Sequence, residues 1–164
     1  MTLTIRAITD ADWPAVWPIL HATFAAGETY TYPRDSSEQD IRRTWTEVPR
    51  ATYVACNENQ EILGTYFLKP NQTGGGSHVC NCGYVVAAAT QGKGVAAAMC
   101  EHSQVEAVRL GFRAMQFNFV VSTNERAVAL WQRLGFAIVG RLPGAFLHPT
   151  LGYVDAFVMF KTLA

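Results

Sequence analysis

The sequence predicts one α+β domain in which antiparallel strands come first and a single parallel crossover follows. Residues 51–56 and 62–69 are apolar, β-branched segments joined by the polar turn 57–60, which is typical of a hairpin. Residues 84–111 pass from a strand through a glycine-rich turn into an alanine-rich helix, which indicates a β-α-β unit. With 164 residues, 49% apolar and 16% charged, the chain is long enough and apolar enough to bury one core.

The N-terminal quarter is expected to hold a short strand, 3–7, followed by two helices. Thr9 and Asp12 have the spacing of a capping box, so the first helix is expected to begin there. Its apolar residues recur at helical spacing: Trp13, Val16, Trp17, Leu20 and Phe24. Gly27 is expected to end this helix. The second helix is expected to begin at Ser36 and to run to about residue 47.

The rest of the chain is expected to complete the same sheet. The long helix after the glycine turn should end at Gly111, and a short helix should follow Asn124. Residues 70–77 and 142–152, which are rich in glycine or contain two prolines, are expected to be loops. The later strands are expected at 78–86, 114–121, 136–140 and 153–162.

Charge and cysteine usage exclude several classes of function. The chain has 13 basic residues (lysine and arginine) and 13 acidic residues (aspartate and glutamate), so its formal net charge is zero. Neither nucleic acid nor a membrane surface is therefore an expected partner. The N-terminus lacks the apolar core of a signal peptide, and no run is long enough to span a membrane. The four cysteines are interpreted as free, buried thiols in a reducing cytoplasm. Cys80 and Cys82 lack further ligands at zinc-site spacing, so no metal is expected.

The turn between residues 84 and 111 has the features of a phosphate-binding site. The first amides of the helix have no intrahelical partners, and the helix dipole adds partial positive charge there. Gly92 and Gly94 remove the side chains that would keep an anion away, and Lys93 could add a cation. The same glycines also fit the sequence fingerprint of a dinucleotide-binding site. That fingerprint requires an acidic residue about 20 positions later to hold a ribose, and residues 115–119 contain none. The P-loop pattern is also absent.

Two motifs, spaced as they are in one known protein family, indicate a resemblance to that family over roughly residues 79–140. The first is Gln91-x-x-Gly94-x-Ala96, which resembles the Q/R-x-x-G-x-G/A signature of the GNAT acetyltransferase superfamily. The second is Asn124-x-x-Ala127-x-x-Leu130-Trp131-x-x-x-Gly135-Phe136. It matches the family pattern N-x-x-A-x-x-L-Y-x-x-x-G-F except at Trp131. The chain is thus similar to GNAT proteins, and more loosely to their phosphinothricin and amino-acid acetyltransferase type.

This resemblance implies a more specific architecture. GNAT proteins have a three-layer α/β arrangement, with a mixed, mostly antiparallel sheet of about seven strands and helices on both faces. Their fourth and fifth strands splay apart beyond the glycine turn. The thioester arm of acetyl-CoA enters that opening and pairs with the fourth strand. Many relatives dimerise, so a homodimer is expected.

The resemblance also assigns residues to acetyl-CoA, which is the expected co-substrate. Amides of the turn would hold the pyrophosphate, and two valines of the fourth strand would offer main-chain bonds to the pantetheine arm. The Val86 amide would polarise the thioester carbonyl, and Asn124 would bond the pantetheine or cap a helix. Ala127 and Trp131 would line the thiol end. The full set is Val85, Val86, Gln91, Gly92, Lys93, Gly94, Val95, Ala96, Asn124, Ala127 and Trp131.

The positions that commonly transfer protons in the family are substituted. Asn81 replaces the glutamate of the pattern E-x-G-Y-x-V, and Trp131 replaces the usual tyrosine. Neither side chain exchanges a proton at neutral pH, although Asn81 can orient an amine or a water. Three explanations stay open. The base is elsewhere, with Glu28 the leading candidate before His78 and Asp155; or ordered waters remove the proton; or catalysis has been lost.

The aromatic loop 27–33 is the expected acceptor region, because the corresponding GNAT region helps to form the acceptor pocket. Glu28, Tyr30 and Tyr32 are expected to contact substrate, together with Asn81, although the tyrosines could merely pack. An acceptor that carries a carboxylate would need a cation, and Arg34 or Arg141 could supply it.

Two functional hypotheses follow. The first is an acetyl-CoA-dependent N-acetyltransferase that transfers acetyl to a small-molecule amine by direct attack in a ternary complex. The alternative is a non-catalytic GNAT-fold protein that senses acyl-CoA or a metabolite, which the substitutions at 81 and 131 favour. A nicotinamide-dependent oxidoreductase is a distant third.

Overall fold

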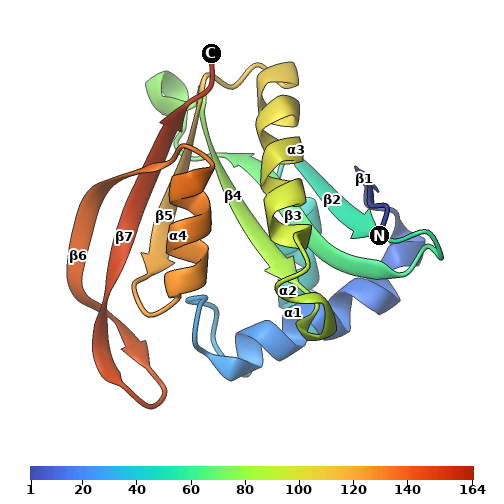
Figure 1. The fold of residues 1–164 in the computed structure, drawn as a ribbon, viewed down its shortest axis with the longest axis horizontal. Coiled ribbons are helices and arrows are strands. Elements are labelled where there is room, and N and C mark those ends of the chain that lie inside the picture. Colours follow the sequence, from blue (N-terminus) through green and yellow to red (C-terminus); the bar gives the residue numbers. More distant parts are fainter.

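The structure, a computed structural model that describes residues 1–164, is one seven-stranded mixed sheet with helices on both faces (Figure 1). The strand order is β1-β2-β3-β4-β5-β7-β6, and only the β4–β5 pair is parallel. The strands are β1 (Thr4–Ala7), β2 (Ala51–Cys56), β3 (Ile62–Pro70), β4 (Val79–Val86), β5 (Ala114–Val121), β6 (Ala137–His148) and β7 (Gly152–Thr162). The helices are α1 (Trp13–Ala26), α2 (Glu38–Arg42), α3 (Val95–Arg109) and α4 (Glu125–Arg133). The predicted fold class is confirmed.

The predicted capping box lies at the short 3₁₀ turn Asp10–Asp12, which leads directly into α1. The Asp12 carboxylate accepts a hydrogen bond from the Thr9 amide at 2.8 Å. Gly27 ends the helix in the left-handed conformation, with φ of 68°. The second helix begins one residue later than predicted, because Ser37 rather than Ser36 caps it and accepts from the Asp40 amide at 3.1 Å. The Ser36 hydroxyl instead donates to the carbonyl of Pro33.

The C-terminal hairpin corrects one prediction. Residues 142–152 are not an irregular loop, because β6 continues to His148 and pairs with β7. The register shifts between Leu142 and Phe146, and the amide of Gly144 donates to an Asp155 carboxylate oxygen at 2.8 Å. Pro143, one of the two prolines that suggested a loop, lies in this irregular part of the edge strand β6. Its missing N–H therefore breaks no hydrogen bond between strands.

Two apolar cores lie on opposite faces of the sheet. On one face, Met99 and Cys100 of α3 pack with Cys80 and Cys82 of β4. On the other face, α1, α2 and the π-helical turn Arg43–Glu47 that continues α2 pack over Val85. Neighbouring β4 side chains therefore alternate between the two cores, as a strand requires. All four cysteines are buried and free.

The parallel pair β4–β5 is joined over only part of its length. Although each strand has 8 residues, only three register pairs connect them, and the last is Asn81 with Gln116. Beyond that pair β5 stays with β7, with an irregularity between Phe117 and Val120. Figure 1 shows the two strands diverging toward the N-terminal ends of α3 and α4. The predicted splay between the fourth and fifth strands is confirmed.

None of the helices is both long and apolar enough to cross a membrane. The structure also contains no group of three or more His, Cys, Asp or Glu side chains that could hold a metal ion.

Candidate functional site

The glycine turn presents free main-chain amides at the N-terminus of α3. Gly92 and Gly94 have φ of 78° and 84°, and Gly94 is the N-cap residue. The first helical bond runs from the Ala98 amide to the Gly94 carbonyl at 3.0 Å, so the amides of Val95 and Ala96 precede it without helical partners. A Cβ built on Gly94 would have no atom within 4 Å. An anion can therefore approach these amides from open space.

Arg126 is a residue of this region that sequence analysis missed. It lies in the first turn of α4, and its Nη2 is 2.9 Å from where a Cβ on Gly92 would be. The guanidinium thus lies against the glycine turn, although 34 positions separate the two residues in the sequence. Lys93, the predicted cation, is exposed on the same turn. The signal in the sequence was the position of Arg126 inside the second motif, two residues after Asn124.

The main-chain direction of β4 determines which amides face the opening. The Val79 carbonyl accepts from Asn71, and the Ala87 amide donates to Leu63, so odd-numbered residues bond β3. The register between β3 and β4 is continuous, and main-chain groups alternate in direction along a strand. The groups of Val86 therefore face the opening, whereas those of Val85 are directed to β3. Of the two valines predicted to bond the pantetheine arm, only Val86 has free main-chain groups there.

Aromatic side chains line one wall of the opening. Trp131 of α4 is 8% exposed, and its ring centroid lies 5.1 Å from Tyr84 and 5.2 Å from Phe117. Ala127 packs against the same core one helical turn earlier. The Tyr84 hydroxyl is bonded to Ser103 Oγ at 2.6 Å and is directed away from the opening into the core. This wall is apolar and contains no acid.

Asn124 does not cap α4 with its side chain. Its backbone has φ of −83° and ψ of 62°, and the side-chain oxygen accepts no bond from the helix. The Asn124 amide donates to Val121 at 3.0 Å, which places the residue immediately after β5. Asn124 thus occupies the N-cap position of α4, where its carbonyl accepts from the Val128 amide at 3.1 Å, but its side chain makes no capping bond. The assignment of the Asn124 side chain to the cofactor stays a prediction.

A row of amide side chains crosses the point where β4 and β5 separate. Asn81 Nδ2 donates to the Gln116 carbonyl at 2.9 Å, next to the last register pair of the two strands. Gln116 Nε2 donates to Asn118 Oδ1 at 2.9 Å, and Asn118 Nδ2 donates to Asn71 Oδ1 at 2.7 Å. None of these groups titrates near neutral pH, so Asn81 can orient polar atoms but cannot act as a base.

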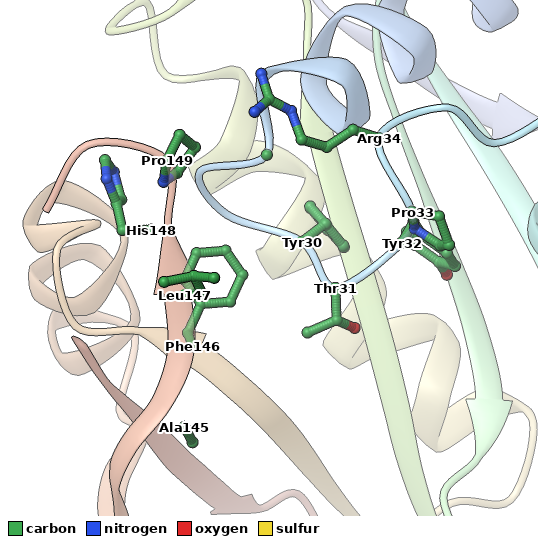
Figure 2. Close-up of a pocket in the computed structure, with 11 residues that line it drawn as sticks. Tyr30, Thr31, Tyr32, Pro33, Arg34, Ala145, Phe146, Leu147, His148 and Pro149 are labelled. Atoms are coloured by element: carbon green, nitrogen blue, oxygen red, sulfur yellow. The ribbon is translucent and has the colours of Figure 1, made fainter. Parts of the chain in front are cut away.

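A groove of about 470 Å³ lies between the loop after α1 and the end of β6 (Figure 2). Gly27 and residues 30–34 form one wall, and residues 145–149 form the other. The Tyr30 hydroxyl donates to the Tyr84 carbonyl at 2.8 Å. This carbonyl faces the opening, as the main-chain groups of Val86 do. Tyr30 thus connects one wall of the groove to the edge of β4 that faces the opening, although no β4 residue lines the groove itself. The 145–149 wall was not predicted, because those residues were interpreted as a loop.

Tyr30 and Tyr32 both line the groove and both pack. The Tyr32 ring lies 4.5 Å from Phe24, and the Tyr30 and Tyr32 rings stack at 5.9 Å. Burial raises the pKa of Tyr30 far above its usual range, and it also raises the pKa of Tyr32. Both hydroxyls are therefore protonated at neutral pH, but the Tyr30 proton is already donated to the Tyr84 carbonyl, so Tyr30 can only accept from a ligand.

None of the three candidate bases lines the groove. Glu28 is exposed and is not among the residues that line the groove. His78 is exposed at the start of β4, at the far end of the strand from Val86. Asp155 is paired with Arg141, and the Gly144 amide and this arginine lower the pKa of its carboxyl. Its lone pairs are directed to the β6–β7 hairpin.

Comparison with known proteins gives a consistent result. The pattern of the acetyltransferase (GNAT) family matches residues 13–136. N-acetyltransferase aca1 of Schizosaccharomyces pombe is 37% identical over 111 residues, which is 67% of this chain and 53% of that protein. The chain therefore spans about half the length of this curated relative.

Solved structures extend the similarity to the whole chain. A GCN5-related N-acetyltransferase from Kribbella flavida is 44% identical, with a TM-score of 0.94 and 98% of each chain covered. The protein yncA of Salmonella typhimurium, described with its cofactor acetyl-CoA, is 23% identical with a TM-score of 0.86, over 100% of this chain and 95% of that one. The latter similarity concerns the fold alone. On the family match and the Kribbella structure together, this chain belongs to the acetyltransferase (GNAT) family.

Proposed function

We propose that the chain is an acetyl-CoA-dependent N-acetyltransferase that transfers an acetyl group to the amine of a small molecule, by direct attack in a ternary complex. The observation that carries the proposal is the continuity of three features. Free amides at the start of α3 lie next to the opening between β4 and β5, and Tyr30, which lines the groove, bonds to the same edge of β4. One molecule at the turn and one in the groove would thus meet at β4.

The cofactor side fits the chemical groups of acetyl-CoA. Two phosphates would lie against the amides that follow Gly94, with the Arg126 guanidinium beside them. The Val86 amide, directed into the opening, would donate to the thioester oxygen as negative charge develops there. Trp131 would close the apolar wall beside the sulfur and keep water away.

The acceptor side would act by positioning. A neutral amine in the groove attacks the thioester carbon, the carbon–sulfur bond breaks, and the nitrogen loses one proton. We propose that ordered water removes that proton, because Glu28, His78 and Asp155 do not line the groove and the Asp155 carboxylate is already paired. Thiolate leaves without prior protonation, since the reference pKa of a thiol is about 8.5. The Asn81 amide and the Tyr30 hydroxyl would orient the water and the amine.

A thiol-release assay with acetyl-CoA and a broad amine panel tests the proposal. Release of CoA that depends on an added amine, with a matching N-acetyl product by mass spectrometry, is the expected result. Tight acetyl-CoA binding without turnover of any amine would instead support the sensor hypothesis, for which the neutral side chains of Asn81 and Trp131 are the specific observation.

We also propose that the chain forms a homodimer. Strand β6 is the edge of the sheet, and Val139 and Leu147 on it are each 61% exposed. An unpaired edge with exposed apolar side chains is a common interface between copies. Light scattering after size-exclusion chromatography would show a mass of twice 18.0 kDa, and a single-chain mass would contradict the proposal.

A further inference from the structure

The opening between β4 and β5 is closed at the end that lies away from the glycine turn. The two strands pair as far as Asn81 and Gln116, and the Asn81 side chain bonds to the Gln116 carbonyl at that point. The turn and α3 follow Val86, at the other end of β4. A molecule that holds its phosphates at the turn and lies along β4 therefore directs its far end toward Asn81.

Three aromatic rings close one face of this end. The Tyr84 ring lies 5.9 Å from Phe117 and 5.1 Å from Trp131, and the Phe117 and Trp131 rings lie 5.2 Å apart. Phe117 and Trp131 are buried in the core that α3 covers. A chain at this end of the opening cannot pass between the rings without displacing close-packed side chains.

Tyr30 closes the opposite face, where it belongs to the core under α1. Its hydroxyl donates to the Tyr84 carbonyl, and the next carbonyl along β4 that faces the opening is that of Val86. The hydroxyl also lies directly over the strand, because a Cβ on Gly83 would be only 3.2 Å from it. The same Cβ would be 2.7 Å from Phe67 Cε1, so glycine is what lets both rings approach β4 there.

Aromatic neighbours hold Tyr30 in this position. Its ring packs edge-on against Phe24 at 5.2 Å and against the fully buried Trp45 at 6.3 Å. It also stacks on Tyr32 at 5.9 Å. Among the residues that line the groove, only Tyr30 has a hydrogen bond to β4. Tyr30 therefore stands between the groove and the strand edge, with its ring and its hydroxyl both engaged.

The position of the Tyr30 hydroxyl limits the space beyond a thioester. With the thioester oxygen at the Val86 amide, the acyl carbons continue along β4 toward the Tyr84 carbonyl. Two residues of a strand span about 6.6 Å, and van der Waals contact with the hydroxyl takes up about 3.5 Å of that length. The rest, about two carbon–carbon bonds, fits an acetyl or a propionyl group. A longer chain would have to displace Tyr30.

We infer that Tyr30 limits the length of the acyl group, so that the donor is a CoA thioester with a short acyl group, acetyl or propionyl, and longer chains are excluded. The inference rests on the proposed function, because it assigns the opening to the thioester arm. A simpler explanation is that Tyr30 only anchors the loop after α1 to the sheet. Its removal would then loosen the fold without changing the preference among acyl groups.

The test compares acetyl-, propionyl-, butyryl- and hexanoyl-CoA, which share the CoA portion and differ only in the acyl group. Calorimetry would measure each Kd for the wild-type protein, Tyr30→Ala and Tyr30→Leu, with Tyr32→Ala as the control. Tyr32 belongs to the same aromatic cluster and lines the same groove, but it has no bond to β4. We expect the wild-type affinity to fall at least about 10-fold from acetyl- to hexanoyl-CoA, because a packed side chain would have to move.

Both Tyr30 variants should reduce this ratio to less than about 3-fold, while their acetyl-CoA Kd stays within about 3-fold of the wild-type value. Tyr32→Ala should keep the wild-type ratio. Leucine preserves part of the packing, so Tyr30→Leu decides if Tyr30→Ala lowers the Tm too far for measurement. Equal wild-type affinities for acetyl- and hexanoyl-CoA would overturn the inference, as would an unchanged ratio in Tyr30→Leu or an equal change in Tyr32→Ala.

These binding measurements use no amine, so they keep the two proposals distinct. The expected acyl preference without turnover of any amine would support the inference while the proposed function fails. Transfer to an amine at equal rates from acetyl- and hexanoyl-CoA would support an acyltransferase and refute the inference. Absence of binding by all four thioesters would refute both.

Discussion

The cofactor side and the acceptor side of this protein are built in different ways. The turn before α3 uses main-chain amides, and its two left-handed glycines lie within three residues of each other. The groove uses side chains from two segments, 27–34 and 145–149, that are more than 100 residues apart in the sequence. A site made of backbone depends on local conformation, whereas a site made of side chains depends on the register of the whole sheet. Changes on the two sides should therefore separate cofactor binding from acceptor specificity.

The largest effect is expected at the glycine turn. Gly94→Glu should weaken acetyl-CoA binding by at least about 100-fold, because a carboxylate would lie against the proposed diphosphate site. Calorimetry with acetyl-CoA measures the change. Gly111→Glu is a matched control, since Gly111 has φ of 93° and equally open space, so that variant carries the same backbone strain without the anion site. Equal acetyl-CoA affinities for the two variants would contradict a phosphate-binding site at the glycine turn.

A smaller effect is expected where the two sides meet. Tyr30→Phe removes the hydroxyl that donates to the Tyr84 carbonyl, and we expect kcat/KM for the amine to fall about 10-fold, the cost of one hydrogen bond. The acetyl-CoA Kd should stay within about 2-fold. Tyr32→Phe is the control, because Tyr32 lines the same groove without that bond. A loss confined to acetyl-CoA affinity would place Tyr30 on the cofactor side instead.

Substitution of Arg126 should change acetyl-CoA binding and leave acceptor specificity unchanged. Arg126→Gln is expected to raise the acetyl-CoA Kd about 5-fold at low salt and less at high salt, because the guanidinium is exposed and its charge is screened. Arg133→Gln, on the same helix but at its other end, is the control. Binding measured at two ionic strengths gives both numbers. An unchanged Kd at low salt would remove Arg126 from the site.

The smallest effect is expected at Glu28, which the sequence suggested as the base. Its side chain is exposed and does not line the groove, so Glu28→Gln should change kcat less than about 3-fold. A pH–rate profile of the variant would show whether an essential base has been lost. A fall of 100-fold or more, with loss of the acidic limb, would restore Glu28 as the base and refute the proposed role of water.

The same contrast explains what the sequence could predict. The strand 114–121 and the end of α1 at Gly27 were predicted because local residues determine them. The splay between the fourth and fifth strands was predicted only from the family resemblance that the two motifs carry. The continuation of β6 was missed because Pro143 and Gly144 are typical of a loop. In the structure, Asp155 on the neighbouring strand holds that segment in the sheet.

Long-range contacts account for the other differences. Arg34 and Arg141 cannot be distinguished in the sequence, since the pairing of Arg141 depends on the register between β6 and β7. The approach of Arg126 to Gly92 depends on how α4 packs on the sheet. The choice between Val85 and Val86 required the alternation of bonds along β4, which no residue type encodes.

Amide hydrogen exchange with and without acetyl-CoA tests the central claim most directly, because it follows the amides themselves. The account predicts that protection on binding is concentrated in two places: the turn amides of Gly92, Gly94, Val95 and Ala96, and the opening-facing amide of Val86. The amide of Val85, already bonded to β3, should not change. Binding of acetyl-CoA that leaves the turn amides unprotected, or that protects only segments away from β4 and α3, would contradict the account.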